Sequence, residues 1–255
     1  MNRLVGIVWG EFVLIPLLAL VGIYLTVGLH AMPWRYLGYA VRLLWHRESG
    51  ETQGEISPFQ ALMTALSATI GTGNIAGVAT AIYFGGPGAV FWMWVIALVG
   101  MATKYAEALL AVKFREVDAA GQYVGGPMYY IKNGLGSQWG WLAFLFALFG
   151  TIAAFGIGNM VQSNSVADAL HSNFDVDQKT TGAVIAILAG LVILGGIQRI
   201  GAVAGKLVPL MAIAYIVGSL TIILSHVSEV PAALSLIVDS AFNGSAAAGG
   251  FAGAG

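Results

Sequence analysis

The chain has 255 residues, of which 58% are hydrophobic and 9% are charged, and its mean hydropathy is +0.83. A typical soluble domain carries about 25% charged residues, so the composition excludes that class and predicts a polytopic membrane protein. The formal net charge of −1 and the scattered basic residues exclude a nucleic-acid-binding protein, and the absence of cysteine excludes disulfides and thiolate metal sites.

The first apolar segment runs from Leu4 to Leu29. It is longer than the roughly 7–15 residues of a signal-peptide core, and no small-residue cleavage site follows it. We therefore expect a membrane span, with Glu11 and Pro16 as its irregular positions. The next segment, His30–Arg47, interleaves aromatic and basic residues and predicts an amphipathic helix at the membrane interface.

The second span opens at Ser57 and Pro58, which supply a helix N-cap and a proline at the first helical position, and it ends near Phe84. Its middle, Ser67–Gly77, places glycine, hydroxyl and amide residues where a lipid-facing helix has Leu and Ile. Non-helical backbone at membrane depth is tolerated only where it lines a cavity or is buried in protein. A glycine-interrupted span therefore predicts a break in the helix and a transporter binding site.

Four further spans are expected, at residues 89–112, 139–167, 180–197 and 206–224. The more polar stretches between and after them predict a short interfacial helix at 125–133, a connector at 198–205 and an interfacial segment at 226–243. Residues 244–255 are rich in Gly and Ala and predict the opening of another helix.

The distribution of basic residues predicts the orientation of these spans. If the N-terminus is outside, the cytoplasmic loops hold most of the Lys and Arg residues, and the outer side keeps only Arg3 and Lys179. The cytoplasmic set is Arg35, Arg42, Arg47, Lys113, Arg115, Lys132, Arg199 and Lys206. The positive-inside rule favours this orientation, in which the second span runs from the cytoplasm to the outside.

The predicted break has the chemistry of a site for an amino acid and a cation. Its outer half-helix offers free N–H groups to a carboxylate, and its inner half-helix offers C=O groups to a hard cation such as sodium. Gly71 and Gly73 permit unwinding and close approach of a ligand to the backbone. Thr69, Thr72 and Asn74 add oxygens without adding charge.

The centre of every expected span lacks Asp and Glu. A transported cation would then be neutralised by another group, and the carboxylate of a zwitterionic substrate is a candidate. This favours an amino acid over a sugar or an amine.

Several other interpretations of these patterns remain open. The Gly-x-Gly-x-x-Ala pattern at 71–76 imitates a dinucleotide fingerprint but lacks the strand and the acidic residue that this motif requires. Gly73 and Gly77 fit small-residue helix packing, and the polar run around Gln162 fits hydrogen bonding between helices as well as ligand contact. Lys104 and Glu107, three apart in the third span, fit either an ion pair or a coupling role.

Long motifs in the chain closely resemble the bacterial alanine or glycine:cation symporter family, which includes sodium:alanine symporters. The first is SPFQALMTALSATIGTGNIAGVATAI at 57–82. The others, in order, are GGPGA at 85–89, MATKYAEA at 101–108, VGGPMYYI at 124–131 and GNMVQSNS at 158–165. The resemblance covers nearly all of the chain.

The resemblance implies an all-α transporter fold of five plus five helices in inverted repeats, similar to the amino acid–polyamine–cation superfamily. It assigns residues 4–29 to one extra N-terminal helix, 57–225 to the first five core helices and 244–255 to the start of the sixth core helix. Only the first half of such a fold is expected in the chain, and the missing C-terminal half would complete the site.

By position in these motifs, the resemblance also assigns the site. Thr69, Gly71, Thr72, Gly73, Asn74 and Gln162 are implied to bind the substrate. Thr69, Ile70 and Asn74 are implied to bind sodium through backbone and side-chain oxygens.

The expected function is secondary symport in a bacterial inner membrane, with the N-terminus outside. Sodium or protons would drive uptake of alanine, glycine or another small neutral amino acid, with no enzyme activity and no cofactor other than the co-transported ion. The expected partners are the amino acid, sodium and the lipid bilayer. Two alternatives stay open: a truncated membrane product that does not transport, and a channel, which would require charged or carbonyl-lined positions on several helices.

Overall fold

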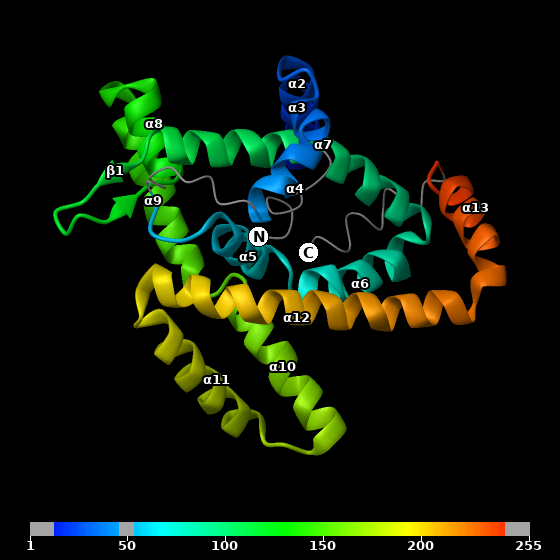
Figure 1. Cartoon of the computed structure of the whole chain (residues 1–255). Coiled ribbons are helices and arrows are strands. Elements are labelled where there is room, and N and C mark those ends of the chain that lie inside the picture. Colours follow the sequence, from blue (N-terminus) through cyan, green and yellow to red (C-terminus); the bar gives the residue numbers. More distant parts are fainter. Residues whose placement is uncertain (1–12, 46–53, 243–255) are drawn as a thin grey trace. The chain divides into compact units, whose positions relative to one another are not determined.

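The structure, a computed structural model, describes residues 13–45 and 54–242, and these are mostly helical (Figure 1). The α-helices are α2 Leu14–Gly28, α3 Met32–Arg35, α4 Leu37–Trp45, α5 Pro58–Thr69, α6 Ala76–Gly85, α7 Gly88–Lys113, α8 Pro127–Leu135, α9 Gly140–Ala154, α10 Asn159–Phe174, α11 Gln178–Ile193, α12 Gly196–Ser225 and α13 Val230–Ser240. Short 3-10 helices are η1 Thr72–Asn74, η2 Ser137–Trp139 and η3 Val227–Glu229. Two strands, β1 Glu116–Val117 and β2 Tyr123–Val124, pair antiparallel.

Several of these helices have the length and hydropathy of membrane spans. Within the described residues, three stretches qualify alone: Gly88–Lys113, Ser137–Phe174 and Gly196–Ser225. Pro58–Thr69 and Thr72–Gly85 qualify together as one bent span, and Pro16–Gly28 and Gln178–Ile193 are apolar but shorter. A helical, multi-pass membrane protein is therefore confirmed.

One expected feature was wrong. The connector expected at 198–205 is helical, because α12 already begins at Gly196. Arg199 made this stretch look like a loop, but its Nη1 donates to the carbonyl oxygen of Leu191 at 2.9 Å, near the end of α11. A basic side chain there satisfies an end-of-helix carbonyl. The β1–β2 hairpin is a short addition to this mostly helical fold.

Parts of four predictions lie outside the described residues. They are the beginning of the N-terminal span, including Glu11, and the last two residues of the expected interfacial helix, His46 and Arg47. The other two are the last residue of the interfacial segment expected at 226–243 and the whole helix expected at 244–255. The described part of the interfacial segment forms two short helices, α3 and α4, and the short helix expected at 125–133 is confirmed as α8.

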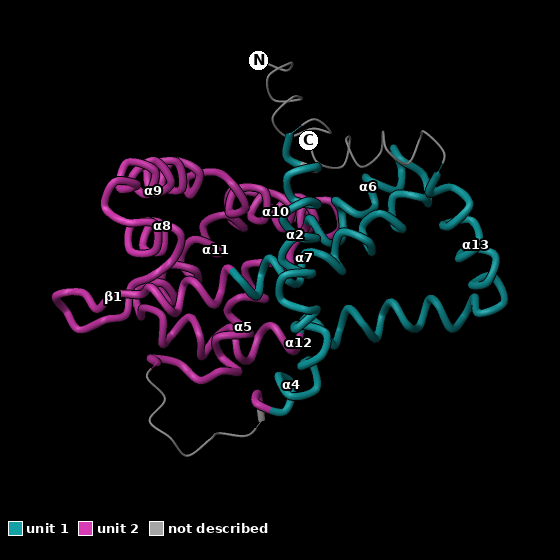
Figure 2. The backbone as a smooth tube through the Cα atoms, turned by 90° about the horizontal axis from the view of Figure 1, so that it is seen from above, with its two compact units in different colours: residues 1–42, 73–106, 211–255 teal, residues 43–72, 107–210 magenta. Residues whose placement is uncertain are grey.

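The chain divides into two compact units (Figure 2). The first comprises residues 1–42, 73–106 and 211–255, and the second comprises residues 43–72 and 107–210. In the first unit α13 docks onto the beginning of α7. Trp92 Nε1 donates to the carbonyl oxygen of Ala241 at 2.7 Å, and the rings of Phe91 and Trp92 lie 5.6 and 6.0 Å from that of Phe242.

Gly88 should be needed for this docking. A Cβ added there would collide with the backbone of Ser240, whereas one added at Gly100, on the same helix, meets no atom within 4 Å. We expect Gly88→Ala to destabilise the protein by about 1–3 kcal/mol through overpacking, and Gly100→Ala not to destabilise it. Thermal unfolding in detergent measures both; equal melting temperatures for the two variants would contradict the docking.

The core of the second unit joins α5 to the first half of α12. Ser57 caps α5: its Oγ accepts from Gln60 N–H at 3.2 Å, and Gln60 Oε1 accepts from Ser57 N–H at 3.0 Å. The expected N-cap is thus confirmed and forms a full capping box. Apolar side chains then hold the two helices together, namely Phe59, Met63 and Leu66 of α5 with Ala204 and Val208 of α12.

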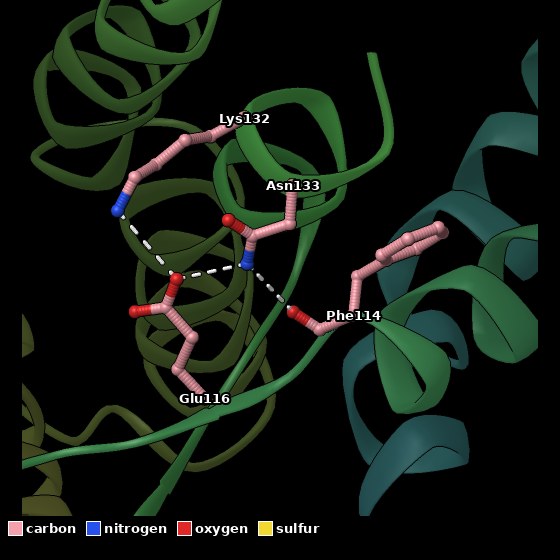
Figure 3. Close-up of polar contacts among 4 residues, drawn as sticks. All are labelled: Phe114, Glu116, Lys132 and Asn133. Atoms are coloured by element: carbon pink, nitrogen blue, oxygen red, sulfur yellow. Dashed lines mark hydrogen bonds and ion pairs between the residues drawn. The ribbon is translucent and has the colours of Figure 1, made fainter. Parts of the chain in front are cut away.

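A polar network in the same unit joins the β1–β2 hairpin to α8 (Figure 3). Asn133 Nδ2 donates to Glu116 Oε1 at 2.8 Å and to the carbonyl oxygen of Phe114 at 3.2 Å, and Lys132 Nζ lies 3.5 Å from Glu116 Oε1. The hairpin is also tied to the approach to α5, because Tyr123 N–H donates to Glu55 Oε1 at 3.0 Å.

The network predicts a pH dependence. The hydrogen bond from Asn133 and, to a lesser degree, the charge of Lys132 hold the pKa of Glu116 below its ordinary value of 4.5. Because the folded state favours the carboxylate, this contact contributes fully above pH 4.5 and is lost as the pH falls through the lowered pKa. A carboxyl-carbon NMR titration should show Asn133→Ala raising the Glu116 pKa toward its ordinary value. An unchanged midpoint in Asn133→Ala would contradict the assignment.

Candidate substrate site

The expected break in the second span is confirmed. Helix α5 ends at Thr69, and Ile70 adopts an extended conformation with φ −87° and ψ 117° before η1 begins at Thr72. The chain bends by 69° at this point, and α6 resumes at Ala76. The last carbonyls of α5 and the first N–H groups of η1 and α6 therefore lie within a few residues of each other, without a continuous helical ladder.

The side chains at the end of α5 leave oxygen atoms near the break. Thr69 Oγ1 donates to the carbonyl oxygen of Ala65 at 2.8 Å, and Ile70 N–H donates to that of Leu66 at 2.7 Å. A hydroxyl that donates keeps its lone pairs, so the Thr69 oxygen remains able to accept a hydrogen bond or to coordinate a cation. The peptide carbonyls of Thr69 and Ile70 follow the last complete turn of α5.

Gln162 of α10 reaches the break from a distant part of the sequence. Its Oε1 accepts a hydrogen bond from Thr72 N–H at 3.2 Å. A Cβ added at Gly71 would collide with the Gln162 side-chain amide, the far end of a flexible side chain, which would have to move away. Among the expected site residues, Gly71, Thr72 and Gln162 are thus brought together in one unit.

Gly73 and Asn74, two other expected site residues, continue the same turn, and no contact of theirs with Gln162 is described. Gly73 and Asn74 follow Thr72 in η1 and are assigned to the other compact unit. A Cβ added at Gly73 would meet no atom within 4 Å. Their roles in binding therefore remain predictions.

Sequence reasoning missed a second break, which lies in the expected fourth span. Helix α9 ends at Ala154 and α10 begins at Asn159, with Gly158 at φ 85° between them. Asn159 bridges the gap: its Nδ2 donates to the carbonyl oxygen of Ala154 at 3.0 Å, and its Oδ1 accepts from Met160 N–H at 2.8 Å. The paired glycines at 156 and 158 were the available signal.

The oxygen atoms near the first break are of the type that hard cations prefer. Among the residues that the structure describes, there is no cluster of three or more His, Cys, Asp or Glu side chains. Peptide carbonyl and hydroxyl oxygens, such as those of Thr69 and Ile70, are the ligands that hard cations prefer. Lys104 and Glu107 both lie in α7, and whether they serve coupling remains a prediction.

The chain is similar to several amino acid carriers. A sodium/alanine symporter, AgcS, of Methanococcus maripaludis is 53% identical over 255 residues, covering 99% of this chain and 56% of that protein. Two Bacillus subtilis proteins are the "probable sodium/glutamine symporter GlnT", 38% identical, and the amino-acid carrier protein AlsT, 37% identical. Their matches cover 100% and 90% of this chain and 53% and 48% of those proteins.

The chain thus spans about half the length of the curated relatives it matches. The profile of the sodium:alanine symporter family matches residues 1–255. Since this match extends over every residue, the chain belongs to the sodium:alanine symporter family.

Proposed function

We propose that the chain forms part of a secondary transporter that couples sodium entry to the uptake of alanine, glycine or another small neutral amino acid. The family is one of transporters and not of enzymes. A relative at 53% identity is named a sodium/alanine symporter. The coupling ion and the substrate of this chain are carried over from such relatives as a proposal.

The observation that carries the proposal is the hydrogen bond across the first break. Thr72 N–H is directed at a side-chain carbonyl oxygen, Gln162 Oε1, at 3.2 Å. A substrate carboxylate is an acceptor of the same kind and a stronger one, because hydrogen bonds to ionised acceptors are roughly twice as strong as neutral ones. The carboxylate would bind at Gly71–Asn74, with the Gln162 amide beside it, and Thr69 would contribute its oxygen.

Sodium would bind at the end of α5. The carbonyl oxygens of Thr69 and Ile70, the hydroxyl oxygen of Thr69 and the side chain of Asn74 are neutral ligands of the type that sodium accepts. The substrate carboxylate would balance its charge. Loading both ligands at one break would couple them, since each would stabilise the other at the site.

The wider architecture is part of the same proposal. We assign residues 4–29 to an extra N-terminal helix and 57–225 to the first five core helices of a five-plus-five inverted-repeat fold. The α5–α6 helix would be the broken first core helix, in agreement with its break. The N-terminus would lie outside, in the inner membrane of a bacterium.

Uptake of labelled alanine into proteoliposomes tests the function, using the complete gene product that carries residues 1–255. We expect uptake that rises with an inward sodium gradient at constant pH, and a higher sodium concentration for half-maximal uptake in Asn74→Ala. Uptake indifferent to both the sodium gradient and Asn74→Ala, but driven by a proton gradient, would replace sodium by protons as the coupling ion.

Competition experiments show which small amino acids the transporter accepts as substrates. Excess unlabelled alanine, glycine, glutamine and alaninamide should be compared, because one relative is named for glutamine. Alanine and glycine should inhibit labelled uptake, and alaninamide, which lacks the carboxylate, should not. Inhibition by glutamine alone would reassign the substrate while leaving the carboxylate site in place.

A further inference from the structure

The second helix break lies directly before the residue that reaches the first one. Helix α9 stops at Ala154, the four residues Phe155–Gly158 form turns, and α10 starts at Asn159. Gln162 lies three residues into α10, and its own N–H donates to the carbonyl oxygen of Gly158 at 2.9 Å. The placement of the Gln162 side chain therefore depends on how this turn is held.

One side chain replaces the helical bonds that the turn loses. In a continuous helix the carbonyl of Ala154 would accept from the N–H of Gly158. Here it accepts from Asn159 Nδ2 at 3.0 Å, while Asn159 Oδ1 accepts from Met160 N–H, one of the first N–H groups of α10, at 2.8 Å. Gly158, at φ 85°, supplies the left-handed residue that the turn requires.

Ser163 adds hydrogen bonds within the first turn of α10, which begins at Asn159. Ser163 Oγ donates to the carbonyl oxygens of Asn159 and Met160 at 2.9 and 3.1 Å. The contacts thus run from the end of α9 through the Asn159 side chain into the turn that carries Gln162, and from Gln162 Oε1 to Thr72 N–H. Both breaks meet along this path, and each of these residues lies in the same compact unit.

We propose that Asn159 is a positioning residue, whose side-chain amide holds the α9–α10 break in the turn that places Gln162 on the Thr72 N–H. It acts on substrate through Gln162 and does not itself touch substrate. The effect on transport rests on the function proposed above, whereas the effect on the Thr72 hydrogen bond does not.

Hydrogen exchange of the Thr72 amide tests the positioning without any transport. In the purified complete protein, Asn159→Ala should speed this exchange roughly threefold to tenfold, as expected from loss of about one net hydrogen bond. Asn159→Asp keeps an acceptor for Met160 N–H but loses the donor to Ala154, so it should give the same direction of change with α10 still folded. Asn173→Ala is the matched control, since Asn173 also donates from α10 to a carbonyl, that of Ala169, at 2.8 Å.

A double-mutant cycle tests the action on transport. Asn159→Ala should raise the KM for alanine, and the same change made in Gln162→Ala should raise it no further, because Asn159 acts through Gln162. Unchanged Thr72 exchange in both Asn159 variants would overturn the proposal. Additive effects on KM would overturn it too, by showing that Asn159 acts independently of Gln162. If the wild type transports no alanine, the proposed function fails, and the exchange result still decides the role of Asn159.

Discussion

Gly71→Ala is expected to abolish most alanine uptake, because the added methyl group takes the place of the Gln162 amide beside the first break. The collision is relieved by moving this amide, because it is the far end of a flexible side chain. A displaced Gln162 side chain no longer lies beside the carboxylate that is proposed to bind Thr72 N–H, so the site loses one of its polar groups. We expect uptake at limiting alanine to fall at least about tenfold, the factor that corresponds to 1.4 kcal/mol.

Two further variants separate this steric cause from general damage. Gly77→Ala is the control, since a Cβ at that position of α6 meets no atom within 4 Å and alanine is the better helix former. Gly71→Ala combined with Gln162→Ala removes the colliding amide, and it should take up no more alanine than Gly71→Ala does, because both variants lack Gln162 beside the break. A single Gly71→Ala variant with normal alanine KM would show that the close approach to Gln162 has no role in binding.

Gln162→Glu should weaken alanine binding by a different mechanism. The side chain keeps its length and an oxygen that accepts from Thr72 N–H, but it adds a negative charge beside the proposed carboxylate site. Two like charges about 4 Å apart repel by about 4 kcal/mol at the effective dielectric constant near a protein surface. The KM for alanine should therefore rise at least about tenfold, while alaninamide becomes a better competitor than it is for the wild type.

Asn173→Asp controls for the added charge, because it places an acidic residue on the same helix far along from the break. Its KM should match that of the wild type. An unchanged KM in Gln162→Glu, measured at the same pH and sodium concentration, would mean that the carboxylate binds elsewhere.

The sequence was sufficient to predict the first break for clear physical reasons. Ser57 and Pro58 mark the start of α5 by capping chemistry, which depends only on neighbouring residues. Glycine and hydroxyl residues inside an apolar span have few uses other than a break, and the break lies where they are. The approach of Gln162 came from a family resemblance, since no local pattern reveals a contact between residues 72 and 162.

Sequence reasoning missed the α9–α10 break, the helical stretch at 198–205 and the β1–β2 hairpin, because other patterns in the same segments were stronger. The apolar run around Phe155 hid the α9–α10 break, although Gly158 takes the positive φ that a turn needs. The polarity around Arg199 suggested a connector, yet Gly201 and Ala204 are small residues of a helix that packs closely against Ile56 and α5. The hairpin depends on Asp118, whose Oδ1 accepts from two N–H groups of its turn.

Together the two breaks suggest why this part of the chain is so rich in small and polar residues. The first break presents backbone groups, the second precedes the residue whose amide meets them, and α12 packs against α5 through Ala204 and Val208. A change at any of these contacts should reach the same hydrogen bond at Thr72. The central claim is that this N–H is a binding group for the substrate carboxylate.

Solid-state NMR tests that claim most directly. The complete protein would be labelled with ¹⁵N at Thr72, reconstituted in lipid with sodium, and given alanine labelled with ¹³C at the carboxyl carbon. A hydrogen bond from Thr72 N–H to the carboxylate places the two labels about 4 Å apart, so we predict a strong dipolar coupling that Gln162→Glu and excess unlabelled alanine both remove. Saturating bound alanine without any coupling to Thr72 would contradict the account.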